Sequence, residues 1–189
     1  HMIGDEAAEC TKLTTRKAAT RVSEYAFDYA RKNHRSKVSC VHKANAVSMA
    51  DGLFLKCFRE VAAKNPDIPS DDFMVDATAY YLAKCPEKFE VIVAANQYGD
   101  ILSDLAAGLV GSLGLAPGAN VGEDGLIVVE ASHGAAPDIA GQGIANPIAL
   151  ILSGALLLRH MGETKLAEYV EQSTIAVLSE KEALTPDLG

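Results

Sequence analysis

The chain has 189 residues, 49% hydrophobic and 22% charged, which is typical of a globular protein with one ordinary domain or two small ones. Its net charge of −8 and its lack of a long basic block argue against nucleic acid or a membrane surface as a partner. No apolar run is long enough to span a bilayer, and the spacing of the four cysteines fits neither a zinc site nor a disulfide framework.

Helical and strand-like segments alternate through the first half of the chain. Apolar residues at helical spacing predict helices over about 14–33, 51–65 and 77–84, and short apolar runs predict strands at 37–41, 73–75 and 91–95. Cys40 and Cys57 fall within these elements, so we expect reduced thiols in a core. The alternation predicts α/β layers, with polar residues gathered at the carboxyl ends of the strands; these residues are His42, Lys43, Asp76, Asn96 and Asp100.

The stretch from Asn96 to Asp104 joins the third strand to an apolar helix predicted from Ile101 to about Leu113. Asp100 and Asp104 are four residues apart, so a helix would place them on one face, in a first turn whose dipole favours negative charge. Paired carboxylates suit a hard cation such as Mg²⁺ or Mn²⁺. The alternative is that Asp100 caps the helix and Asp104 is an ordinary solvated residue.

The second half of the chain is rich in small residues. Glycines recur at 108, 111, 114 and 118. Gly108 and Gly111 fall on an apolar helix with no strand immediately before them, which favours close helix–helix packing, within the chain or across a subunit interface, over a phosphate loop. Residues 116–120 read as a loop and 126–130 as a strand. The loop 132–141 has small side chains that let backbone N–H groups approach a flat or phosphorylated ligand. Helix 148–160 is apolar almost all round, which predicts burial against a partner subunit, and an amphipathic helix follows over 163–179.

Together these stretches resemble the metal-dependent, decarboxylating isocitrate and isopropylmalate dehydrogenases. The motifs are VHKAN (41–45), DGLF (51–54), NQYGDILSD (96–104), APGANVG (116–122), EASHGAAPDIAG (130–141), ANP (145–147) and LLRHMG (157–162). The resemblance runs from about residue 12 to 189. His42 before Lys43 makes the chain most similar to the NAD-dependent isocitrate dehydrogenases of the kind found in mitochondria.

The resemblance implies a partial α/β fold with the α/β/α layers of this family, which is not a Rossmann fold. Residues 1–13 then read as a tag and the tail of a preceding segment, 14–110 as a small α/β domain with a dimer-interface helix, and 111–189 as the C-terminal part of a large cofactor-binding domain. The family's N-terminal half, with its substrate-gripping arginines and catalytic tyrosine, has no counterpart in this sequence. We therefore expect these 189 residues to be inactive alone.

The resemblance also implies roles for individual residues. Lys43 and Asp76 match catalytic positions, Asp76, Asp100 and Asp104 match the metal carboxylates, and Lys43, Asn45 and Asn96 match the substrate pocket. In this family Lys43 and Asp76 come from one subunit and Asp100 and Asp104 from the other. A complete site would then need a homo- or heterodimer or a higher oligomer.

The loop at 132–146 matches the family's nucleotide-binding segment. His133, Gly134, Ala136 and Asn146 match adenine-nucleotide contacts, and Asp138 and Ile139 match the positions that choose the cofactor. An acidic side chain at 138 can accept hydrogen bonds from the ribose hydroxyls of NAD and repels the extra phosphate of NADP. Without the family, Asp138 would be an ordinary loop aspartate after a proline.

The activity implied is the oxidative decarboxylation of isocitrate to 2-oxoglutarate and CO₂, with reduction of NAD and a requirement for Mg²⁺ or Mn²⁺. One alternative is a regulatory or assembly subunit of such an enzyme. Another is a relative that acts on homoisocitrate, isopropylmalate or tartrate. The resemblance suggests the mitochondrial matrix, and a bacterial cytoplasm fits the composition equally well.

Overall fold

The computed structural model describes residues 1–189. They divide into two compact units, residues 1–103 and 104–189, and the boundary lies within helix α4 (Asn96–Val110). None of the helices combines the length and hydrophobicity needed to cross a bilayer.

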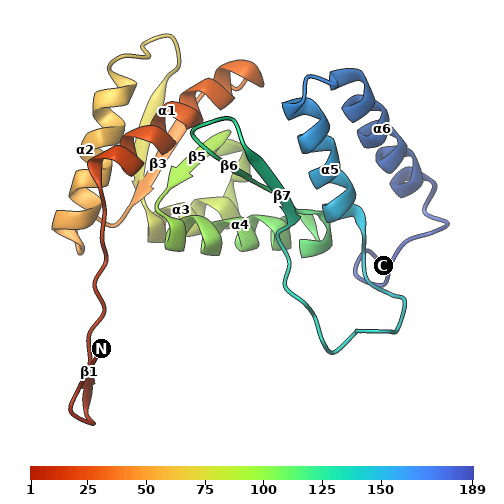
Figure 1. The fold of residues 1–189 in the computed structure, drawn as a ribbon, viewed down its shortest axis with the longest axis horizontal. Coiled ribbons are helices and arrows are strands. Elements are labelled where there is room, and N and C mark those ends of the chain that lie inside the picture. The colour runs from red at the N-terminus through yellow and green to blue at the C-terminus, as the bar shows by residue number, and fades with distance from the viewer. The chain divides into compact units, whose positions relative to one another are not determined.

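The first unit is built on a parallel three-stranded sheet in the order β4–β3–β5 (Figure 1). Its strands are β3 (Val38–His42), β4 (Ser70–Met74) and β5 (Val91–Ala94), and a short hairpin of β1 (Met2–Ile3) and β2 (Ala7–Ala8) precedes them. The connecting helices are α1 (Arg16–Lys32), α2 (Ser48–Ala62) and α3 (Val75–Lys84), with a 3₁₀ turn, η1, at Pro86–Lys88. The predicted α/β layering is confirmed for this unit.

The strand order explains where the helices lie. The chain moves from β3 outward to β4 and then back across to β5, so right-handed connections place α2 and α3 on opposite faces of the sheet. Helix α1 packs beside α2 (Figure 1). Phe27 of α1 and Phe58 of α2 stack with ring centroids 5.8 Å apart, and both are buried. Cys40 and Cys57 are buried free thiols in the same core, as predicted.

The second unit begins with the C-terminal part of α4, followed by a 3₁₀ turn, η2 (Leu113–Leu115), and an antiparallel hairpin, β6 (Pro117–Val121) and β7 (Ile127–Ala131). Helix α5 (Ile148–His160) packs on this hairpin, and α6 (Thr164–Glu180) packs on α5 (Figure 1). Residues 116–120, predicted to be a loop, are therefore mostly strand. The prediction was wrong because β7 supplies a pairing partner that local composition does not reveal.

Helix α4 differs from its prediction at both ends. The carbonyl of Ala95 accepts hydrogen bonds from the N–H groups of Tyr98 and Gly99 at 3.0 and 2.9 Å, so the helix begins at Asn96, five residues early. The first turn then contains no acidic residue, which removes the predicted interaction of Asp100 and Asp104 with the helix dipole. At the other end Gly111 has φ +125° and terminates the helix instead of packing within it.

Helix α5 is only partly buried by the rest of the chain. The buried residues are small, namely Ala149, Ser153 and Ala155, whereas Leu150 is 59% exposed and Ile151 is 43% exposed. The uniform apolarity of this helix therefore exceeds what the chain itself covers.

Candidate functional site

Lys43 and Asp76 come together at the carboxyl end of the parallel sheet. Strand β3 ends at His42, its neighbour β4 ends at Met74, and the register pairs these two residues, so both chains leave the sheet at one level. The Lys43 Nζ donates a hydrogen bond to the Asp76 Oδ1 at 2.5 Å. Together with the N–H groups at the start of α3, this bond holds the pKa of the exposed Asp76 carboxyl below its usual value.

The turn that carries Lys43 is held by a buried side chain on each side. The Asp51 Oδ2, in the first turn of α2, accepts the Lys43 backbone N–H at 2.8 Å. The His42 Nδ1 accepts the Ala44 N–H at 3.1 Å. Both side chains are almost fully buried, Asp51 at 1% and His42 at 7% exposure. Consecutive backbone N–H groups of this turn are therefore fixed by side chains that cannot readily move away.

His42 is itself fixed by a carboxylate. Because its Nδ1 accepts a hydrogen bond from the Ala44 N–H, its Nε2 carries the hydrogen and donates to the Asp72 Oδ1 at 3.2 Å. The Arg59 guanidinium bonds the Asp72 Oδ2 at 3.0 Å. Burial would raise the pKa of the Asp72 carboxyl, but these two donors hold it below its usual value. The Asp72–Arg59 ion pair thus fixes the orientation of the His42 imidazole.

Lys12 fixes the Asp51 carboxylate in a similar way. Its Nζ pairs with the Asp51 Oδ1, donates to the Tyr98 hydroxyl at 3.2 Å, and lies 4.3 Å from the centre of the Tyr98 ring. Burial would raise the pKa of the Asp51 carboxyl, but Lys12 and the Lys43 N–H hold it below its usual value. Neither Lys12 nor Asp51 was singled out from the sequence. A carboxylate in the first turn of a helix that follows a strand end was the available signal.

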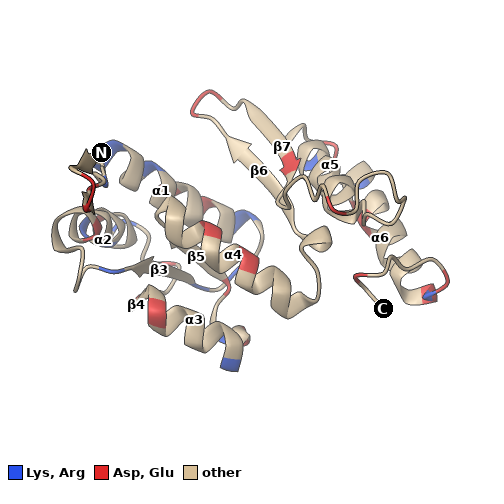
Figure 2. Ribbon diagram, turned by 90° about the horizontal axis from the view of Figure 1, so that it is seen from below, with Lys and Arg blue, Asp and Glu red and all other residues tan.

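The other predicted residues of the first site lie on the surface. Asn45 is in the turn after β3, Asn96 is the first residue of α4, and Asp100 and Asp104 follow on α4; all four are exposed. All charged residues of α4 are acidic (Figure 2). No three acidic, histidine or cysteine side chains of the chain lie close enough together to hold a metal ion. The structure therefore brings Lys43 and Asp76 together but does not join them to the α4 carboxylates.

The predicted nucleotide loop lines a cavity of about 710 Å³ in the second unit, a size that suits a nucleotide-like ligand. His133, Gly134, Ala136, Ile139 and Asn146 line it, together with small residues from the 140–145 segment. Most of the lining residues are small, which leaves backbone N–H groups accessible to a flat ligand such as the adenosine of NAD.

Two of the loop residues have special conformations or positions. Ala136 has φ +41°, a left-handed conformation that is uncommon without glycine. Asp138 is exposed and does not line the cavity, although its neighbour Ile139 does. Its backbone carbonyl accepts a hydrogen bond from the Gln142 side chain at 2.7 Å, which closes the loop on itself. The Asp138 carboxylate is thus free in solvent beside the cavity.

Asn146 is the best-fixed member of the nucleotide loop. It is 9% exposed, its Oδ1 accepts the Ile148 N–H at 3.0 Å, and its Nδ2 donates to Asp187 at 2.9 Å. Ser112 also donates to Asp187, and both Ser112 and Asp187 line the cavity. A side chain on Gly114 would approach the Asn146 Cβ to 2.7 Å, so glycine is required there. Sequence reasoning missed Asp187, because nothing local distinguishes it from other aspartates that follow a proline.

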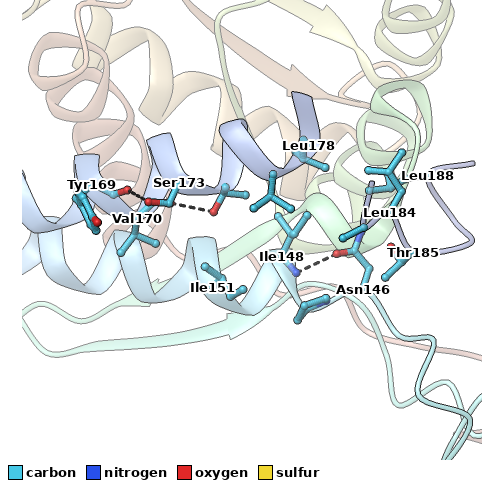
Figure 3. A pocket seen from close by; sticks show the side chains of 14 residues that line it. Asn146, Ile148, Ile151, Tyr169, Val170, Ser173, Leu178, Leu184, Thr185 and Leu188 are labelled. Carbon is cyan, nitrogen blue, oxygen red and sulfur yellow. Dashed lines mark hydrogen bonds between the residues drawn. The ribbon is translucent and has the colours of Figure 1, made fainter. Parts of the chain in front are cut away.

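A second cavity of about 450 Å³ lies between α5, α6 and the segment after α6 (Figure 3). Its lining is mostly aliphatic and includes Ile148, Ile151, Val170, Leu178 and Leu184. It offers no acid–base pair and no cluster of charges. It therefore lacks the acidic and basic side chains that a catalytic site requires.

Comparisons with known proteins identify the family of the chain. The family model described as isocitrate/isopropylmalate dehydrogenase matches residues 1–189. The mitochondrial NAD isocitrate dehydrogenase catalytic subunit 6 of Arabidopsis thaliana is 50% identical over the whole chain, which covers 50% of that protein. The alpha subunit of the human mitochondrial NAD enzyme is 47% identical, with 52% of its length covered. The chain thus spans about half the length of the curated relatives it matches.

Solved structures give the same result. An isocitrate dehydrogenase from Methylococcus capsulatus superposes with a TM-score of 0.96 at 49% identity, and the match covers 100% of this chain and 56% of that one. The TT0538 protein from Thermus thermophilus also gives a TM-score of 0.96, at 41% identity, with 38% of its chain covered. With the family model matching every residue, the chain belongs to the isocitrate/isopropylmalate dehydrogenase family.

Proposed function

We propose that this chain is part of an NAD-dependent isocitrate dehydrogenase that oxidises isocitrate and releases CO₂ to give 2-oxoglutarate. The observation that carries the proposal is the Lys43–Asp76 pair, joined at 2.5 Å at the carboxyl end of a parallel sheet. A neutral lysine amine can accept a proton from a substrate hydroxyl, and the ammonium that results can return a proton later. The relatives named as NAD isocitrate dehydrogenase subunits, at 47–50% identity, support this assignment.

Lys43 is positioned for proton transfer because its backbone is fixed and its side chain is only partly buried. The N–H is bonded by Asp51, while the side chain is 27% exposed and so can reach a ligand. Its ammonium would bind the substrate's oxygen atoms, and its neutral amine would accept the proton of the hydroxyl that becomes the carbonyl. Asn45 and Asn96, both exposed, would donate hydrogen bonds to the substrate carboxylates.

Asp76, Asp100 and Asp104 would hold a divalent cation, because carboxylate oxygens are the ligands that Mg²⁺ and Mn²⁺ prefer. The cation would supply Lewis-acid polarisation of the substrate's oxygen atoms. Helix α4 also exposes apolar side chains beside its two carboxylates, namely Ile101 (56%), Leu109 (49%) and Val110 (71%). A helix with this surface suits contact with a second subunit, so we place Lys43 and Asp76 of one subunit opposite α4 of another.

NAD would occupy the cavity lined by His133, Gly134, Ala136, Ile139 and Asn146. The Asp138 carboxylate would accept hydrogen bonds from the ribose hydroxyls and disfavour the phosphate of NADP. The names of the relatives place those proteins in mitochondria, and we propose the mitochondrial matrix as the location here, with a bacterial cytoplasm as the alternative.

The test is an assay of a full-length protein that contains these residues, with isocitrate and Mn²⁺, comparing NAD with NADP. We expect turnover with NAD, little with NADP, and little with homoisocitrate, isopropylmalate or tartrate. Turnover with one of those acids instead of isocitrate would correct the substrate. No turnover with any of them in a folded protein that still binds NAD would favour a regulatory or assembly subunit.

A further inference from the structure

The carboxylate of Asp51 is the most deeply buried charged group of the first unit. It is 1% exposed, lies in the first turn of α2, and uses both oxygen atoms. One oxygen accepts the Lys43 N–H at 2.8 Å, and the other is paired with the Lys12 ammonium. A buried carboxylate is maintained only where such donors repay its lost hydration. The two bonds therefore depend on each other.

Lys12 connects this carboxylate to another element. It lies before α1, with its side chain 30% exposed, and it also donates to the hydroxyl of Tyr98 and covers the ring. Tyr98 is in the first turn of α4, between Asn96 and Asp100. One ammonium thus ties the turn that carries Lys43 to the start of the helix that carries the proposed substrate- and metal-binding groups.

We propose that the Lys12–Asp51 ion pair is a positioning element, which holds the Lys43 backbone and the first turn of α4 in the geometry that proton transfer needs. This inference rests on the function proposed above for Lys43. Lys12 and Asp51 do not touch the substrate in this scheme; they act through Lys43 and Tyr98. Loss of Lys12 leaves a buried carboxylate without its cation, so Asp51 takes up a proton or a water molecule and its bond to the Lys43 N–H weakens.

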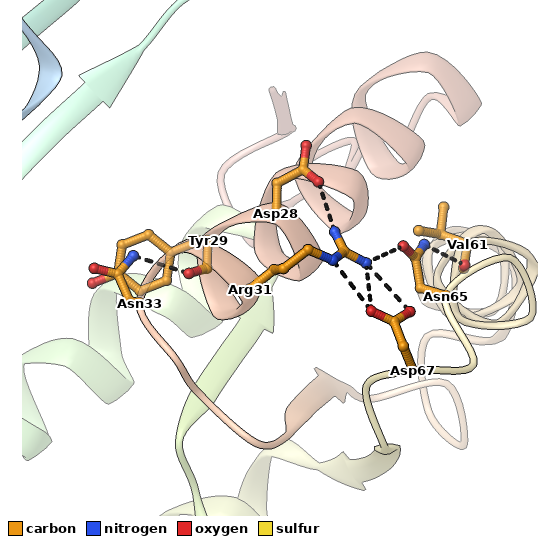
Figure 4. Close-up of polar contacts among 7 residues, drawn as sticks. All are labelled: Asp28, Tyr29, Arg31, Asn33, Val61, Asn65 and Asp67. Carbon is orange, nitrogen blue, oxygen red and sulfur yellow. Dashed lines mark hydrogen bonds and ion pairs between the residues drawn. The ribbon is translucent and has the colours of Figure 1, made fainter. Parts of the chain in front are cut away.

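A comparison with an ordinary ion pair shows what is particular here. Arg31 bonds Asp28 at 3.1 Å and Asp67 and Asn65 at 3.0 Å, so it also joins separate segments (Figure 4). Its partners Asp28 and Asp67 are 65% and 55% exposed. This network bonds no residue of the Lys43 turn, which makes Asp67→Asn a matched control for Asp51→Asn.

The experiment uses the full-length enzyme with the variants Lys12→Met, Asp51→Asn, Lys12→Arg and Asp67→Asn. We expect Lys12→Met and Asp51→Asn each to lower kcat about 10- to 100-fold, because small misplacements of a catalytic group have effects of this size. KM for NAD should stay within about twofold, since the nucleotide cavity is lined only by residues 112–187. Lys12→Arg should recover most of kcat because it keeps the charge and can stack on Tyr98.

The double variant should lose about as much as the more affected single variant, because both changes break one interaction. Asp67→Asn should keep the wild-type kcat. A kcat within about twofold of wild type for both Lys12→Met and Asp51→Asn would overturn the inference. So would a loss that Lys12→Arg fails to recover, or one that Asp67→Asn shares. If Asp51→Asn does not fold, Lys12→Met decides, since that side chain is partly exposed.

Lys43→Met in the same assay separates the two proposals. If it abolishes turnover while Lys12→Met and Asp51→Asn do not reduce it, only the positioning role fails. If Lys43→Met retains wild-type turnover, the proposed role of Lys43 fails, and the positioning inference fails with it.

Discussion

The two units of this chain place their functional groups by different physical means. In the first, polar side chains at or near the strand ends are held by partners: Lys43 by Asp76, Asp51 by Lys12, and His42 by Asp72. In the second, the cavity proposed to bind the nucleotide is lined largely by small residues of a loop. Groups that transfer protons or bind a metal need fixed side chains, whereas backbone N–H groups suffice to bind a nucleotide.

The two units also differ in the size of the hydrophobic side chains that they bury. The first unit buries large side chains, among them Phe27, Phe54 and Phe58. In the second, the buried hydrophobic side chains are alanines, while Leu150, Ile151 and Tyr169 are exposed. The first unit therefore contains its own hydrophobic core, and much of the large apolar surface of the second remains uncovered by this chain.

The largest expected effect is the difference in stability lost between a buried position of the first unit and an exposed position of the second. Phe58→Ala should destabilise the first unit by about 3–5 kcal/mol, because it removes a buried ring stacked on Phe27. Leu150→Ala in the second unit, at a side chain 59% exposed, should cost less than about 0.5 kcal/mol. Urea unfolding of the 189-residue chain, followed by circular dichroism, measures both. Equal losses would contradict the difference in packing.

The next effect concerns the metal carboxylates. Asp100→Asn in the full-length enzyme should lower turnover about 100- to 1000-fold, because a Lewis-acid cation contributes several kcal/mol to such a reaction. Titration with Mn²⁺ should show a correspondingly higher concentration for half-maximal activity. Asp124→Asn, an exposed change in the hairpin loop, is the control and should leave both quantities unchanged. Unchanged activity in Asp100→Asn would remove this residue from the metal site.

A smaller effect is expected at the nucleotide loop. Asp138→Asn removes a solvent-exposed charge beside the cavity, so it should raise kcat/KM for NADP relative to NAD by about fivefold, the size of an exposed charge interaction. Steady-state assays with both cofactors give the ratio. If the ratio does not move, cofactor choice lies with other residues of the cavity.

The sequence predicts the sheet and its strand-end residues well because these depend on local pattern. Runs such as Val91 to Ala94 are apolar and bounded by polar residues, and parallel connection brings their carboxyl ends together. This is why the proximity of Lys43 and Asp76 followed from the strand positions. The family motifs then supplied chemical roles that periodicity alone cannot give.

The failures arise where distant segments decide local structure. Strand β6 forms because β7 pairs with it. The start of α4 differs for a local reason, since the Ala95 carbonyl accepts two N–H groups of the following turn. The Lys12–Asp51 pair joins residues 39 positions apart, and Asn146 meets Asp187 across 41 positions. Pairs at such separations carry no local sequence signal, so side chains that hold the site in place are harder to predict than those that face the ligand.

The smallest expected effect is a dependence of stability on acid at Asp187. Burial would raise the pKa of this carboxyl, but hydrogen bonds from Ser112 and Asn146 lower it to about 2, from an ordinary value of 3.8. A lowered folded-state pKa means that the stabilisation is complete above about pH 4 and is lost as the pH falls towards 2.

Because Asp187 is exposed, this contribution should stay below about 1 kcal/mol. Asp187→Asn should therefore be slightly less stable than wild type at pH 5, and the two should converge between pH 4 and pH 2. Urea unfolding at a series of pH values measures this, with Asp124→Asn as a control that should show no such convergence. A difference that stays constant down to pH 2 would mean that the bonds to Ser112 and Asn146 do not depend on the charge of Asp187. The cavity would then be closed by neutral hydrogen bonds, and the second unit would differ from the first in this respect too.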